Sequence, residues 1–141
     1  MKTSARNTLR GVVEQVVDGA VNAEVSLDIG GGVAIVAIIT RRGVQDMDLA
    51  PGKQAIALIK ASFVLLAKGD QPLATSARNS LAGTIVRIEE GAVNSEIALE
   101  IAPGRTLTAT ITRRSVDDMA LKVGDRATAL IKASHVILAV E

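Results

Sequence analysis

Residues 21–29 read VNAEVSLDI, and apolar side chains occupy every second position of this stretch. The positions between them hold the polar residues Asn22, Glu24, Ser26 and Asp28. An alternation with a period of two is typical of a β-strand that has one face in a core and the other in water. This stretch therefore predicts a strand of an all-β protein.

The same pattern returns 72 residues later, where residues 93–101 read VNSEIALEI. Residues 4–67 and 76–139 align without a gap, and 34 of the 64 aligned positions are identical. Between the two copies lie Gly69 and Pro72, residues typical of a linker. We therefore expect a first domain at 1–68, a linker at 69–74 and a second domain at 75–141.

Each repeat is expected to form five short strands and one short helix. Besides the strand at 21–29, the apolar pattern of the first repeat predicts strands at 9–17, 54–60 and 63–67. The fifth strand is clearest in the second repeat, where threonines alternate with apolar residues at 106–112. The helix is expected between the third and fourth strands, at 40–49, with Thr40 as its cap. This order predicts two tandem OB-like five-stranded barrels.

Composition excludes several classes of protein. The 141 residues include no cysteine, and 16 basic residues nearly balance 15 acidic ones. This excludes disulfides and cysteine zinc sites, and it argues against nucleic acid or a membrane as the partner. The longest apolar stretch, 33–39, is too short to span a membrane, and the N-terminus does not read as a secretory signal, so we expect a cytoplasmic protein. Each repeat is small, and the whole chain has a single phenylalanine, so each core buries little apolar surface. We therefore expect an oligomer, in which further apolar surface is buried between chains.

Two polar motifs are unchanged between the copies, although many surface positions differ. Ser-Ala-Arg-Asn occurs at 4–7 and 76–79, and Lys-Ala-Ser occurs at 60–62 and 132–134. In extended backbone, residues i and i+2 point to one side, so each motif would present a hydroxyl beside a cation. Thr40 adds a hydroxyl at a helix start. Donors and cations without carboxylates indicate a site for a small oxyanion.

These motifs, with Val-Asn-x-Glu and Ile-Thr, resemble the Mop or molbindin domain, and the whole chain is similar to its tandem form (di-Mop, ModG type). The resemblance implies a homotrimer that stores molybdate or tungstate, held by hydrogen bonds at subunit interfaces. In the first repeat, the ligands it implies are Ser4, Arg6, Thr40, Lys60, Ala61 through its backbone, and Ser62. In the second repeat, they are Ser76, Arg78, Thr112, Ser115, Lys132, Ala133 through its backbone, and Ser134.

The two implied sites differ at one position, because Gly43 stands in the first repeat where the second has Ser115. The family also has a site on its three-fold axis, and the candidates for it here are Val21, Asn22, Val93 and Asn94. The neighbouring Glu24 and Glu96 would repel a dianion. They are therefore interpreted as structural residues that pair with Arg or Lys across an interface.

The sequence gives less support to other functions. An OB-type module that binds single-stranded nucleic acid needs aromatic platforms and a basic groove, and this chain has one Phe and a net charge of +1. A regulatory partner that passes a molybdate signal to another protein stays open. No nucleophile–base pair, metal cluster or phosphate loop indicates an enzyme. His135, the only histidine, aligns with Phe63 and is interpreted as a strand residue.

Overall fold

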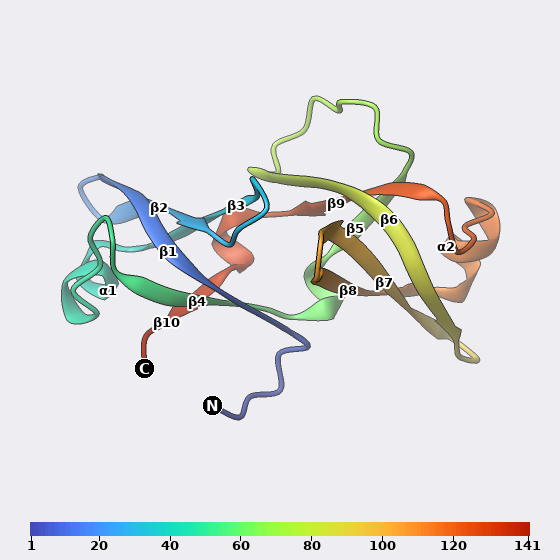
Figure 1. The fold of residues 1–141 in the computed structure, drawn as a ribbon, viewed down its shortest axis with the longest axis horizontal. Coiled ribbons are helices and arrows are strands. Elements are labelled where there is room, and N and C mark those ends of the chain that lie inside the picture. Colours follow the sequence, from blue (N-terminus) through green and yellow to red (C-terminus); the bar gives the residue numbers. More distant parts are fainter.

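The computed structural model describes residues 1–141, and it confirms the all-β prediction with two curled five-stranded sheets and two short helices (Figure 1). The first repeat contributes β1 (Asn7–Asp18), β2 (Asn22–Asp28), β3 (Ala34–Thr40), α1 (Arg41–Asp46), β4 (Gln54–Ile59), the 3-10 turn η1 (Ala61–Phe63) and β5 (Leu65–Lys68). The second contributes β6 (Asn79–Glu90), β7 (Asn94–Ala102), β8 (Arg105–Thr112), α2 (Arg113–Asp118), β9 (Arg126–Ile131), η2 (Ala133–His135) and β10 (Ile137–Ala139).

The two repeats exchange their last strands. One sheet has the order β10-β4-β1-β2-β3, and the other has the order β5-β9-β6-β7-β8. In Figure 1 the C-terminal strand β10 lies beside β4 among the strands of the first repeat. The strand β5 correspondingly pairs antiparallel with β9 of the second repeat. The predicted domain limits describe the sequence repeat, whereas each folded sheet contains strands from both copies.

A glycine in each long first strand allows the neighbouring strand to approach closely. A Cβ atom on Gly11 would lie 2.3 Å from the carbonyl oxygen of Asp28, and one on Gly83 would lie 2.3 Å from that of Glu100. Each glycine precedes an irregularity in the pairing of its strand, between Val13 and Gln15 in the first sheet. The missing side chain therefore allows the neighbouring backbone to approach, which a larger residue would prevent.

The short helices confirm one part of the prediction and correct another. The Thr40 hydroxyl accepts a hydrogen bond from the Gly43 amide at 3.0 Å and caps α1, as expected. The Lys-Ala-Ser motif, however, is not extended, because Ala61 and Ser62 lie in the turn η1. Lys60 and Ser62 are thus not on one face of a strand, and the predicted strand at 63–67 begins only at Leu65.

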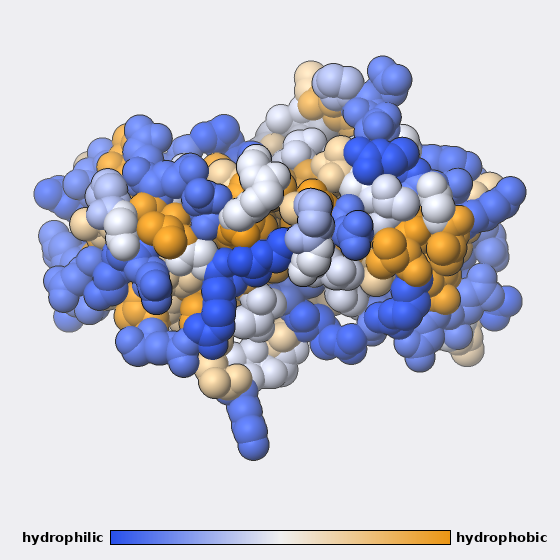
Figure 2. Space-filling model, viewed as in Figure 1, coloured by the Kyte–Doolittle hydropathy of each residue, from blue (hydrophilic) through white to orange (hydrophobic).

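Small aliphatic side chains fill a cluster of 28 buried residues drawn from both sheets. Its largest fully buried members are the leucines and isoleucines of the central strands, such as Leu27, Ile59, Ile97 and Ile131. On the face shown in Figure 2, apolar residues form separate patches among polar ones. No helix is long and apolar enough to cross a membrane.

Two buried asparagines connect the halves. Asn7 is 2% exposed; its amide accepts a hydrogen bond from the Thr108 backbone at 2.7 Å and donates to the Thr108 carbonyl at 2.8 Å. Asn79 makes the same pair of bonds with Val36, at 2.7 and 2.8 Å. Each amide therefore binds the backbone of the opposite repeat as a further strand would. Since Asn7 shares the inward parity of Leu9 and Val13, its position in the sequence could have indicated this burial.

Candidate functional site

One pocket gathers predicted ligands from both repeats. Its cavity of about 320 Å³ is lined by Ser62 from the first repeat and by Asn94, Thr112 and Ser115 from the second. The turn η1 packs against β8, which brings Ser62 to the end of that strand. We call this the Ser62 pocket. It brings the first repeat's serine to Thr112 and Ser115 rather than to Thr40, a grouping that the sequence did not predict.

The start of α2 supplies two hydroxyl groups to the Ser62 pocket. The Thr112 Oγ1 and Ser115 Oγ atoms are 2.8 Å apart, and the Ser115 amide donates to Thr112 Oγ1 at 3.1 Å. At the start of α1, Gly43 leaves only the hydroxyl of Thr40. The two helix starts therefore differ by one donor, as the sequence indicated.

A second pocket holds Lys60, one of the two predicted cations of the first repeat. Ser4 and Lys60 line a cavity of about 260 Å³ together with Phe63, His135 and Ile137. The rings of Phe63 and His135 stack with their centroids 4.4 Å apart, and the Lys60 ammonium lies 5.6 Å from the Phe63 ring centre. Since His135 belongs to the turn η2, the strand role proposed for it is wrong. This Lys60 pocket also combines both repeats.

The predicted arginine ligands are paired with glutamates of the opposite repeat. Arg6 Nη2 lies 2.7 Å from Glu96 Oε1, and Arg78 Nη2 is hydrogen bonded to Glu24 Oε1. Arg87 also contacts Glu96, at 2.9 Å. The interpretation of the two glutamates as pairing residues is confirmed, and the interface that they bridge lies between the repeats of one chain.

These charges lower the pKa of Glu96. The hydrogen bond from Arg87 is the largest cause, the charges of Arg6 and Arg87 add to it, and partial burial acts in the opposite direction. A carboxylate whose pKa is lower in the folded state stabilises the fold above its ordinary pKa of 4.5, and this contribution is lost as the pH falls through the folded value.

We therefore expect acid to destabilise the wild type more than the variant Glu96→Gln. The glutamine keeps a hydrogen-bond acceptor but has no proton to bind on unfolding. Urea denaturation at several pH values between about 6 and 3 measures this difference. If both proteins lose the same free energy of unfolding over that range, the ion pair does not contribute to folding.

The candidates for the axial site lie at the tips of two hairpins. Val21 and Val93 are 72% and 73% exposed. Asn22 pairs with Thr40 across β2 and β3, and Asn94 pairs with Thr112 across β7 and β8. Asn94 also lines the Ser62 pocket, so this candidate lies beside the first set of ligands rather than apart from them.

The predicted ligands of the second motif copy have equivalent positions. The turn η2 packs against β3 as η1 packs against β8, which places Ala133 and Ser134 on the side of the Thr40 strand. Ala61 and Ala133 are buried, whereas Ser76, Arg78 and Lys132 are exposed. The fold therefore brings Ser62 to Thr112, and it brings the turn that holds Ala133 and Ser134 to the strand that ends at Thr40.

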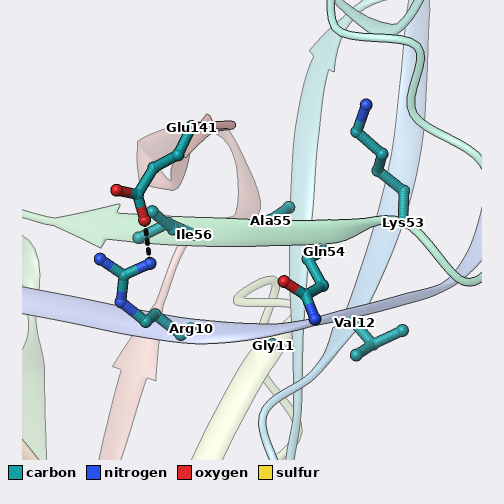
Figure 3. Close-up of a pocket in the computed structure, with 8 residues that line it drawn as sticks. All are labelled: Arg10, Gly11, Val12, Lys53, Gln54, Ala55, Ile56 and Glu141. Atoms are coloured by element: carbon teal, nitrogen blue, oxygen red, sulfur yellow. Dashed lines mark hydrogen bonds and ion pairs between the residues drawn. The ribbon is translucent and has the colours of Figure 1, made fainter.

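A larger cavity, about 470 Å³, lies elsewhere and contains none of the predicted ligands. Arg10 and Lys53 line it between β1 and β4, and Glu141 forms an ion pair with Arg10 at its rim (Figure 3). In the second repeat Ala82 and Asp125 replace the two cations. This cavity is therefore not a repeated feature, unlike the motifs that predict the oxyanion site.

Comparisons with known proteins identify the family. The TOBE domain model matches residues 3–66 and 75–138, which is nearly the entire chain. The chain belongs to the TOBE-domain family. It carries two copies, and the resemblance to tandem Mop proteins is confirmed.

Individual relatives support this membership. A solved structure of the cytoplasmic molybdate-binding protein ModG, with molybdate bound, superposes with a TM-score of 0.95 at 44% identity and covers 100% of both chains, which confirms the tandem OB-like fold. The molybdenum-pterin-binding protein MopA of Rhodobacter capsulatus is 51% identical over 139 residues. The molybdenum transport protein ModE of Azotobacter vinelandii is 40% identical over 140 residues. Each of these two matches covers 99% of this chain. The chain therefore spans about half (52%) of the length of each relative.

Proposed function

We propose that this TOBE-domain chain binds molybdate or tungstate without catalysis, through hydrogen bonds and not through covalent or metal–ligand bonds. The ligands would be the two sets of residues named from the sequence, regrouped across the repeats. The role would be molybdenum storage or homeostasis in the cytoplasm. The Ser62 pocket carries this proposal, because it gathers the hydroxyls of Ser62, Thr112 and Ser115 from both repeats in one cavity.

The chemistry of these groups suits a tetrahedral dianion. Hydroxyl groups donate hydrogen bonds, and neither Lys60 nor Lys132 forms an ion pair with a carboxylate in this chain. Charge-assisted hydrogen bonds contribute about 1.5–3 kcal/mol each, so a few of them support micromolar affinity, which corresponds to about 8 kcal/mol. The relatives ModG and MopA, named for binding molybdate and molybdenum-pterin, support this ligand class.

Isothermal titration calorimetry with molybdate and tungstate tests this function, with sulfate as the control anion. We expect saturable binding of both metal oxyanions below about 100 µM and much weaker binding of sulfate. Binding should also raise the melting temperature, because a ligand that binds only the folded state stabilises it. Equal affinity for sulfate, or no binding at this concentration, would contradict the proposal.

The proposal includes a homotrimer, as the resemblance implies. Leu65 and Ile137, at equivalent positions of the exchanged strands, are 66% and 63% exposed, which leaves apolar side chains for a partner to cover. Light scattering coupled to size exclusion should give three times the 14.6 kDa mass of the chain. A folded monomer at micromolar concentration would contradict it.

A second role follows from the lengths of the relatives. ModE of Azotobacter vinelandii and a ModE transcriptional regulator of Yersinia pestis are about twice as long as the region that this chain matches. The chain would then serve as the oxyanion-sensing partner of a regulatory protein. A pull-down that depends on added molybdate would support this role over storage.

A further inference from the structure

The arginines of the Ser-Ala-Arg-Asn motifs are held in place by the carboxylates of the opposite repeat. Glu24 and Glu96 lie within the paired parts of β2 and β7, whereas Arg6 and Arg78 precede β1 and β6. The side chain of Glu96 is 22% exposed and that of Arg6 is 56% exposed. The glutamate is therefore the fixed member of each pair, and the arginine is the member that it restrains.

The contact leaves most of each guanidinium free. In both pairs Nη2 meets one carboxylate oxygen, and neither arginine forms any other hydrogen bond to a protein side chain. An arginine has five N–H donors in a fixed plane, so a contact at Nη2 leaves donors at Nη1 and Nε. The glutamate can thus orient the group without occupying all of it.

The pairs are retained although their surroundings differ. Position 87 is an arginine that adds a second cation to Glu96, but the equivalent position 15 is a glutamine, so Glu24 meets Arg78 alone. Both reciprocal pairs persist through this change. This argues that the contact between arginine and glutamate, rather than a larger charge network, is the common feature.

We propose that Glu24 and Glu96 are positioning residues for oxyanion binding, which act by pre-ordering Arg78 and Arg6. This inference rests on the proposed function. An unrestrained arginine loses rotamer entropy when it binds an anion, and a restrained one has already lost it. The carboxylate charge itself opposes a dianion. Orientation and charge therefore have opposite effects on affinity, and two substitutions separate them.

The pair of Glu24 with Arg78 gives the cleaner test, because no second cation meets that carboxylate. Arg78 contacts Glu24, which pairs with Ile38 of β3, and that strand ends at Thr40, so Arg78 is assigned to the Thr40 cluster. The parent protein carries Lys60→Ala, which is intended to disable the Thr112 cluster, and molybdate is titrated by calorimetry. Glu24→Ala should weaken binding by about tenfold, because Arg78 loses its restraint. Glu24→Gln keeps an oxygen acceptor for Nη2 without the charge, and it should bind at least as tightly as the parent.

A double-mutant cycle shows whether the effect passes through the arginine. In the background of Arg78→Ala, the variant Glu24→Ala should cause no further loss of affinity. The proposal is overturned if the alanine variant binds as tightly as the parent, if glutamine fails to restore binding, or if the tenfold loss persists without Arg78. Melting temperatures of all variants identify any loss of folding. A wild-type protein that binds no molybdate would instead contradict the proposed function.

Discussion

Replacing Asn7 by alanine is expected to lower the free energy of unfolding by about 3 kcal/mol, and Asn79→Ala should do the same. The Asn7 side chain exchanges two hydrogen bonds with the Thr108 backbone and donates a third to the Ile59 carbonyl at 3.2 Å. Alanine would leave these buried peptide groups without partners. An unsatisfied buried group costs about 1–3 kcal/mol, so the loss exceeds that of an ordinary surface change.

Thermal and urea denaturation measure this loss, and the melting temperature should fall by roughly 6–12 °C. Asn7→Asp is a sharper version of the test, because its carboxylate can accept from the Thr108 amide but cannot donate to the two carbonyls. It should be at least as destabilised as the alanine variant near neutral pH. Thr8→Ala, at the exposed neighbouring position, is the matched control and should change little. Similar stabilities for all three variants would show that the asparagines do not connect the halves.

The strands could be predicted from the sequence because a strand with one buried face has alternating apolar and polar residues. Residues 22–28 of the stretch VNAEVSLDI form β2, in which Ala23, Val25 and Leu27 are buried and the polar residues between them are not. The Thr40 cap was predictable for a similar reason, since a hydroxyl before a short helix satisfies local backbone donors. Both features depend on residues that are near one another in the chain.

The exchange of β5 and β10 could not be predicted in this way. Each of these strands finds the same partner surface on either sheet, because the repeats are similar and Leu58 and Leu130 occupy equivalent positions. The turns η1 and η2 precede the two exchanged strands, and the sequence predicts extended backbone where these turns form. Ser62 therefore lines a pocket with Thr112 and Ser115 of the second repeat, whereas the sequence grouped it with Thr40 of the first.

Two double variants test whether the ligands are grouped across the repeats. One variant is expected to keep half of the molybdate sites, and the other is expected to lose all of them. If Lys60 works with Thr112, then Lys60→Ala with Thr112→Val damages one cluster and leaves the Thr40 cluster intact. Lys60→Ala with Thr40→Val damages both clusters. Each lost charge-assisted hydrogen bond weakens binding by about 1.5–3 kcal/mol, or roughly 10–150-fold.

Titration with molybdate should therefore find about half of the wild-type sites at full affinity in the first double variant, and none in the second. Thr40 and Thr112 cap equivalent helices through the same backbone hydrogen bond, but Thr112 also contacts Ser115 Oγ, so the melting temperatures of both double variants are measured as well. Lys53→Ala, which removes a lysine from the cavity in Figure 3, should leave both classes of sites unchanged. If the second double variant retained half of the sites and the first retained none, each site would belong to a single repeat. The position of Ser62 in one pocket with Thr112 and Ser115 would then have no part in binding.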